Sequence, residues 1–136
     1  MDRARKAGTD AEREKLANEG LAMARNLTYD EGIVRASIQL GEICARANRN
    51  EEALQHYLLV EAKLKNKGSG ANLLTVYRAL GDIFLREKLF SYACRYYGSV
   101  LESSPQDFGT MEKIADAYLL DMRFDSAEFF YKTLIV

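Results

Sequence analysis

The sequence predicts an all-α fold of about seven helices that pack as antiparallel pairs. Apolar residues recur three and four positions apart along most of the chain, which is the spacing of amphipathic helices. The segments between them are short, as in REKLF at residues 86–90, and leave room only for tight turns. A single proline in 136 residues also suits a chain built from helices.

The composition excludes several classes of partner. A hydrophobic content of 48% with 29% charged residues is typical of a soluble globular protein. The formal net charge of −1 gives no general attraction to nucleic acid or to an anionic membrane, and no apolar run is long enough to span a bilayer. Because residues 1–15 lack the apolar core of a secretory signal, we expect a cytoplasmic or other intracellular protein with no nucleic-acid or membrane partner.

The first predicted helix follows a solvated tail at residues 1–8. Thr9 and Glu12 have the spacing of a capping box, so a helix should run from about Asp10 to Asn26. Its apolar stripe, rich in alanine and suited to close packing, consists of Leu16, Ala17, Leu21, Ala24 and Leu27. The helix looks like the second half of a pair whose first helix is absent.

Two further helices form the first complete pair, at about residues 34–65. A second capping box, Thr28 with Glu31, starts a helix that runs to about Ala47. A polar turn follows, and Asn50 is the expected N-cap of the next helix.

A loop and two more pairs complete the chain. The Gly/Ser-rich stretch at residues 65–73 reads as an insertion loop. The next pair occupies about residues 74–105 and ends at Pro105, which cannot continue a helix. Asp107 is the expected N-cap of the last pair, at about residues 108–136.

One pattern recurs in all three pairs. In the central pair it consists of Tyr77, Leu80, Gly81, Phe84, Ala93, Tyr97 and Pro105. The first pair repeats it with Leu40, Gly41, Cys44, Ala53 and Tyr57, and the last with Ile114, Ala115, Tyr118, Ala127 and Tyr131. A glycine inside a helix costs about 1 kcal/mol relative to alanine. Gly81 therefore indicates that a neighbouring helix comes close, and Ala93 is its expected small partner.

This order and spacing resembles the tetratricopeptide repeat, a helix-turn-helix unit that stacks into arrays. The resemblance implies a tetratricopeptide-like domain over residues 9–136, with a half-repeat at residues 9–30, stacked as a right-handed α-solenoid. It also implies a non-catalytic protein-interaction scaffold whose concave groove, lined by the first helix of each pair, binds a peptide or helix of another protein. The candidate groove residues are Arg35, Ile38, Glu42, Arg46, Thr75, Arg78, Asp82, Arg86, Glu112, Asp116, Leu119 and Leu120.

The charges in this set have two interpretations. Glu42 with Arg46, and Asp82 with Arg86, are i,i+4 neighbours that either pair with each other or meet alternating charges on a partner. Asp116 has no such cation four residues on, and with the adjacent leucines it would suit a ligand with a basic residue beside an apolar one.

The family's carboxylate clamp, which holds the C-terminal aspartate of a chaperone tail, is absent. Its positions are occupied by Ile38, Glu42, Ala79, Gly109 and Lys113. Only the lysine among these can donate to a carboxylate, so a chaperone carboxylate tail is not an expected partner.

Nothing in the sequence indicates an enzyme, a cofactor or a metal site. His56 is the single histidine, and no nucleophile or acid accompanies it in sequence. Cys44 and Cys94 read as reduced, packed thiols.

The C-terminal helix supports an alternative function. Its residues Phe130, Leu134 and Ile135 leave little polar surface, whereas the terminal unit of a repeat array normally has a polar outer face. Either the chain is a fragment of a longer array, or this end packs on another molecule. The alternative is therefore an assembly module, part of a larger repeat protein, that stacks end to end or forms a homodimer through its last helix.

Overall fold

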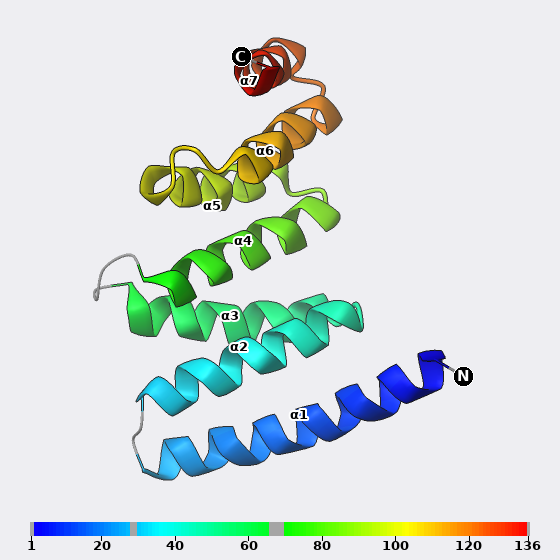
Figure 1. Ribbon diagram of the computed structural model, residues 1–136, viewed down its shortest axis with the longest axis vertical. Coiled ribbons are helices and arrows are strands. Elements are labelled where there is room, and N and C mark those ends of the chain that lie inside the picture. The colour runs from blue at the N-terminus through cyan, green and yellow to red at the C-terminus, as the bar shows by residue number, and fades with distance from the viewer. Residues whose placement is uncertain (1, 28–29, 66–69, 136) are drawn as a thin grey trace. The chain divides into compact units, whose positions relative to one another are not determined.

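The computed structural model describes residues 2–27, 30–65 and 70–135, and within these ranges all regular secondary structure is α-helix (Figure 1). The helices are α1 (Asp2–Asn26), α2 (Asp30–Arg46), α3 (Asn50–Leu64), α4 (Ala71–Arg86), α5 (Phe90–Ser103), α6 (Phe108–Leu120) and α7 (Phe124–Ile135). Each helix packs against its neighbours within two compact units, Met1–Gly68 and Ser69–Val136. The predicted all-α fold of seven helices is confirmed.

Unit 1 has α2 between α1 and α3. Its core is a cluster of buried side chains from α1 and α2, with Leu59 of α3 packed against it. The buried members are Ala17, Leu21, Ala24, Ile33, Ala36 and Leu40. The three alanines let the α1 and α2 backbones approach closely, as the alanine-rich stripe predicts.

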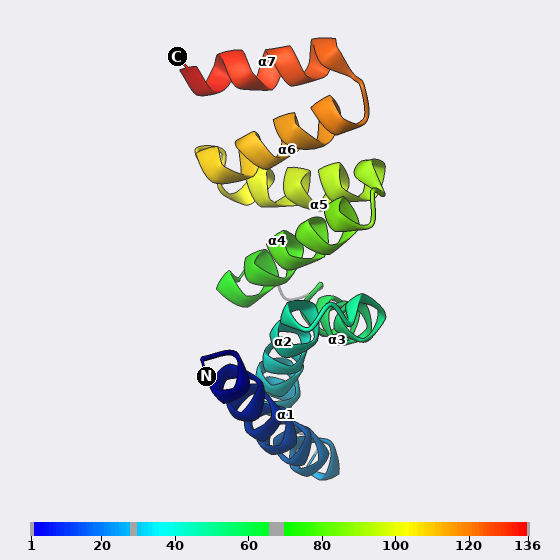
Figure 2. The ribbon, with the colours of Figure 1, turned by 90° about the vertical axis from the view of Figure 1, so that its right-hand side faces the viewer.

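Unit 2 runs through α4, α5, α6 and α7 in order, each helix beside the next (Figure 2). Its core centres on Ala93, Tyr97 and Ile114, which are at most 3% exposed. Side chains from the helices before and after it in the chain pack against this cluster: Phe84 and Leu85 of α4, and Phe130 of α7. Ala93 and Tyr97 of the recurring pattern are therefore core residues, and Phe84 and Tyr118 pack against them.

Gly41 and Gly81, the two glycines of the recurring pattern, each face a tyrosine ring. A Cβ added at Gly81 would lie 2.7 Å from Cδ1 of Tyr97, and one added at Gly41 would lie 2.7 Å from Cζ of Tyr57. Such contacts are too short for carbon atoms, so only glycine leaves room for the ring. The prediction that Ala93 is the close partner of Gly81 is wrong. Ala93 is fully buried, but the atoms nearest to a Cβ at Gly81 belong to the Tyr97 ring.

The three helix hairpins share one turn geometry. Asn48, Lys88 and Met122 all have φ near +60°, and the residue after each donates its N–H to the carbonyl five positions back. This left-handed turn ends a helix and reverses the chain. The sequence did not reveal it, because none of the three residues is glycine.

Several predicted helix boundaries need correction. The expected tail at residues 1–8 is helical from Asp2, so Thr9 lies inside α1 and does not cap it. Asn50 is the first residue of α3, and the N-cap position belongs to Arg49. Asp107 is confirmed as an N-cap because its carboxylate accepts from the Thr110 N–H at 3.1 Å. Thr28 and residues 66–69 of the predicted insertion loop lie outside the described residues. The end of that predicted loop is wrong, because residues 71–73 already belong to α4.

Candidate helix-binding groove

An open groove of about 720 Å³ runs between α1 and α2 on unit 1. Its α1 wall consists of Arg13, Leu16, Ala17, Gly20, Met23, Ala24 and Leu27. Its α2 wall consists of Gly32, Arg35, Ala36, Gln39, Glu42, Ile43 and Arg46. Three residues of the predicted partner-binding set, Arg35, Glu42 and Arg46, therefore meet in one groove.

The α1 wall exposes large apolar side chains. Leu16 is 66% exposed, Met23 is 64% exposed and Leu27 is 74% exposed, although the sequence places both leucines in the packed stripe. Ala17 and Ala24, one position away from Leu16 and Met23, are buried and form the floor. The helix thus has two apolar stripes, one packed on α2 and one open to a ligand.

Small residues leave open space in the groove. A Cβ added at Gly20 would meet no other atom within 4 Å, so the space beside this residue is empty. Gly32 and Ala36 on the facing wall are also small. The groove therefore has room for side chains supplied by another molecule.

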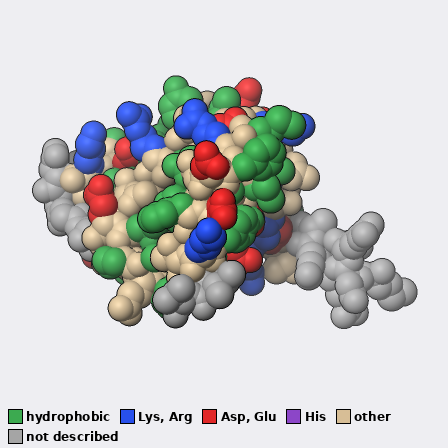
Figure 3. Space-filling view, turned by 90° about the horizontal axis from the view of Figure 1, so that it is seen from above, with side chains coloured by type: hydrophobic (Ala, Val, Ile, Leu, Met, Phe, Trp, Pro, Cys, Tyr) green, Lys and Arg blue, Asp and Glu red, His purple; other side chains and the backbone are tan. Residues whose placement is uncertain are grey.

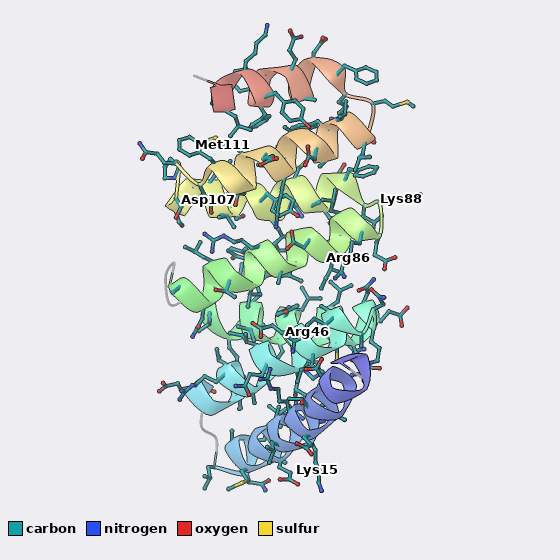
Figure 4. All side chains as sticks on the ribbon, turned by 45° about the vertical axis from the view of Figure 1, so that its right-hand side comes forward. Lys15, Arg46, Arg86, Lys88, Asp107 and Met111 are labelled. Carbon is teal, nitrogen blue, oxygen red and sulfur yellow. The ribbon has the colours of Figure 1, made fainter. Side chains whose placement is uncertain are left out.

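The rim of the groove is mainly basic. Arg13 and Arg35 form no ion pair with any residue that the structure describes, and Glu42 likewise has none there. Arg46, labelled in Figure 4, pairs with Asp10 of α1 at 3.2 Å. This contact ties α2 to α1 beside the groove. The interpretation that Arg46 pairs with Glu42 is wrong, since Asp10 is its partner.

In unit 2, Arg78 and Asp82 of the predicted set join helices. Arg78 of α4 binds Asp107 at 2.8 Å, and the guanidinium holds the pKa of that carboxyl below its usual range. Asp82 accepts from Tyr97 at 2.6 Å and from Lys113 at 2.8 Å. These contacts fix α4 on α5 and α6.

Asp116 has a partner that the sequence did not reveal. The hydroxyl of Tyr131, fifteen residues on, donates a hydrogen bond to its carboxylate. That bond, together with burial and the nearby acids, raises the pKa of Tyr131 to about 12. Asp116 is therefore engaged within its own helix pair.

The other predicted positions do not line the α1–α2 groove. Ile38 is half-buried on α2 and does not line it. Thr75 donates to the Ala71 carbonyl at 3.0 Å, and Arg86 is exposed at the end of α4. Glu112, Leu119 and Leu120 are exposed on α6.

An ion-pair cluster joins α1 to the α2–α3 turn. The guanidinium of Arg49 donates to both carboxylate oxygens of Glu14, at 3.0 and 2.8 Å, and to Glu52 at 3.1 Å. Ligand atoms of Glu14, Cys44 and Glu52 lie within 4.8 Å of one another, a grouping that sequence spacing did not suggest. The cation that these acids bind is Arg49, whose hydrogen bond lowers the pKa of Glu14.

The remaining candidate reactive groups are poorly activated. Burial raises the pKa of the Cys44 and Cys94 thiols, which favours the neutral form. Burial also lowers the pKa of His56, against the attraction of Glu52. Among the described residues, these groups form no arrangement of nucleophile and base.

The C-terminal end of unit 2 exposes apolar side chains, and Figure 3 shows them on one face interspersed with charged residues. Met122, Phe124 and Phe129 are each more than 60% exposed. Of the residues predicted to self-associate, Phe130 stacks on Tyr118 in the core, Leu134 is half-buried, and the side chain of Ile135 lies outside the described set. Phe129 is thus the exposed aromatic of α7.

No protein-family model matches the chain, and no curated protein matches it in sequence. Within the described residues, no helix combines the length and apolar character needed to cross a membrane. The tetratricopeptide resemblance stays a prediction, and the α1–α2 groove is the feature from which function is best argued.

Proposed function

We infer that the chain is a non-catalytic protein-interaction module that binds a helix of a partner protein in the groove between α1 and α2. The observation that supports this most directly is the row of exposed Leu16, Met23 and Leu27 along a groove with a small-residue floor. Contiguous apolar surface rimmed by charge is typical of protein-binding sites. The tetratricopeptide-like pattern agrees with this proposal, which requires no cofactor.

The dimensions of the groove favour a helix as the ligand. Leu16, Gly20, Met23 and Leu27 recur at helical spacing, so the open stripe runs along α1 for about three turns. An amphipathic helix presents apolar side chains at the same spacing and lays them in such a groove. Its backbone hydrogen bonds are already satisfied internally, so burial of its apolar face leaves no unpaired polar group.

Affinity capture with matched variants tests this proposal. Gly20→Phe fills the groove at a position where nothing lies within 4 Å, so the fold should tolerate it. Ala22→Phe adds the same bulk to an exposed position of α1 that does not line the groove. A protein retained by wild type and Ala22→Phe but lost by Gly20→Phe is the expected result. Retention of the same proteins by all three chains would contradict the proposal.

A second candidate function is assembly through the C-terminal end of unit 2. The exposed Met122, Phe124 and Phe129 support it, since large apolar side chains gathered at one end of a repeat array usually need a cover. Sedimentation equilibrium of wild type beside Phe124→Ser, Phe129→Ser measures this directly. A homodimer that dissociates in the double variant is the expected result for assembly, and a wild-type monomer at all concentrations would exclude it.

A further inference from the structure

The three helices of unit 1 have counterparts in unit 2. When Ala17 and Leu21 of α1 are aligned with Ala93 and Tyr97 of α5, and Leu40 of α2 with Ile114 of α6, each buried core residue is matched with a buried core residue. With this correspondence α1, α2 and α3 match α5, α6 and α7. Helix α4 packs on α5 and reaches α6, and no described helix of unit 1 corresponds to it.

Helix α4 occupies, in unit 2, the surface that corresponds to the groove. Its Phe84 stacks on Tyr92 and Tyr96 of α5 with ring centroids 5.4 and 5.6 Å apart. Its Asp82 binds Lys113 of α6 at 2.8 Å.

The counterparts of these α4-binding residues in unit 1 all line the groove. In this alignment Leu16 corresponds to Tyr92, Gly20 to Tyr96 and Gln39 to Lys113, and all three unit 1 residues line the groove. The α1–α2 groove is therefore the surface on which a helix equivalent to α4 would lie.

We propose that the groove receives a helix of a partner protein in the position that α4 has in unit 2, and that this helix carries acidic residues at both ends of its apolar face. This inference rests on the proposed function and adds the position and the chemistry of the ligand. The apolar part of the ligand follows α4, which presents Tyr77 and Phe84 seven residues apart to the rings of α5. Since Gly20 corresponds to Tyr96 and has no side chain, the groove has room for ligand side chains at least as large as Tyr77 and Phe84.

The acidic part follows from the two arginines on the rim. In unit 2, Arg78 of α4 pairs with Asp107, two residues before Gly109. Unit 1 has Ile33 in place of that aspartate and Arg35 in place of that glycine, so a cation now faces this end of the ligand helix. An acidic residue of the ligand helix, at the position that Arg78 has in α4, would pair with Arg35.

The other end of the ligand helix faces a second arginine. The last turn of α4 leads into Leu89, whose N–H binds the Phe84 carbonyl at 2.9 Å. Unit 1 has Arg13 in place of Leu89. A ligand acid at the position of Arg86 would lie next to Arg13. Arg13 and Arg35 both lack an ion pair among the described residues.

Two synthetic helices provide the probe. The basic peptide has the α4 sequence Ala71–Arg86, and the acidic peptide has the same sequence with Arg78→Glu and Arg86→Glu. Because a free helix of this length is only marginally stable, both carry the same helix-stabilising staple. Their affinities for the full chain are measured by fluorescence anisotropy. General attraction cannot favour the acidic peptide, since the chain itself has a net charge of −1.

The acidic peptide is expected to bind about tenfold more tightly than the basic one, since two repulsive contacts become attractive. The double variant Arg13→Glu, Arg35→Glu should reverse this preference. The matched control Lys15→Glu should preserve it, because Lys15 lies on α1 outside the groove and points away from α2 in Figure 4. Gly20→Phe should abolish binding of both peptides.

The outcomes separate this inference from the proposed function. Equal affinities that Gly20→Phe abolishes would overturn the acidic ligand and leave the groove as a helix site. Binding that survives Gly20→Phe, or no binding of either peptide, would overturn the assigned helix position. A concentration-dependent dimer that Gly20→Phe dissociates would identify a second copy of this chain as the occupant and overturn the partner assignment.

Discussion

The hydroxyl of Tyr97 donates a 2.6 Å hydrogen bond to Asp82, fifteen residues earlier, while its ring covers Gly81. The last helix pair repeats the relationship, with the Tyr131 hydroxyl on Asp116 and Ala115 in the glycine position. One acid and one small residue on the first helix thus orient a tyrosine on the second. The phenol end bonds to the acid because a buried hydroxyl needs a partner.

Removal of the Tyr97 hydroxyl should destabilise unit 2. Tyr97→Phe keeps the ring but leaves Asp82 with Lys113 as its remaining described hydrogen-bond donor. A hydrogen bond to a charged acceptor contributes about 1.5–3 kcal/mol to the free energy of unfolding, and urea denaturation should show a loss of that size. Tyr92→Phe, at a position 51% exposed, is the control and should change stability by less than about 0.5 kcal/mol.

A methyl group at Gly81 should also destabilise the fold, although alanine is the better helix former. The added carbon would overlap the buried Tyr97 ring, which costs about 1–3 kcal/mol, against a gain of about 1 kcal/mol in helix propensity. Gly98→Ala has no atom within 4 Å and should raise the melting temperature. If both substitutions were stabilising, the packing of the ring on Gly81 would be refuted.

The hydrogen-bonded tyrosines predict a loss of stability at high pH. Burial, followed by the bond to Asp82, raises the pKa of Tyr97, and the bond to Asp116 raises the pKa of Tyr131 to about 12. Below about pH 10 these tyrosines are protonated in both the folded and the unfolded chain, so they contribute no pH dependence to the free energy of unfolding. Above it the unfolded chain ionises first, and stability falls until the folded pKa is passed.

Urea unfolding at pH 8 and pH 11 measures this effect. Lysines also titrate in this range, so the comparison is between wild type and Tyr97→Phe. The stability difference between the two chains should shrink at the higher pH. A constant difference would show that the Tyr97 pKa is not raised in the folded state.

The left-handed turn residues predict stabilising substitutions. Lys88 has φ +62°, a conformation that costs a residue with a Cβ roughly 1 kcal/mol relative to glycine. Lys88→Gly should therefore raise the melting temperature. Asn48→Gly should raise it less, since asparagine tolerates this conformation better. A drop in melting temperature for Lys88→Gly would contradict the turn geometry.

The sequence predicts the helices well because their signals are local. The aromatic and alanine positions of the recurring pattern mark the core, and Asp107 marks a helix start through its side chain alone. The prediction for Asn50 was wrong because it used residue type alone. Asparagine suits an N-cap, but α3 begins at Asn50 itself, so the N-cap position belongs to Arg49. The tertiary fold, not the residue type, decided the boundary.

The groove was harder to predict because it depends on how α1 packs on α2. Leu16 and Leu27 look like core residues by periodicity, and only the position of α2 shows that a second stripe is left open. The spacing of Leu16, Gly20, Met23 and Leu27 was the available signal. In the same way, the bonds of Asp82 and Asp116 to tyrosines fifteen residues away follow from helix pairing and not from i,i+4 spacing.

A nuclear magnetic resonance titration tests the central claim most directly. The isotopically labelled chain is titrated with the acidic α4-sequence helix, and the backbone amides of its glycines are followed. If a helix binds between α1 and α2, the amides of Gly20 and Gly32, which line the groove, should shift, while that of Gly98 in unit 2 stays in place. Unchanged Gly20 and Gly32 signals at saturating peptide, or shifts confined to unit 2, would contradict the assignment of the groove as the binding site.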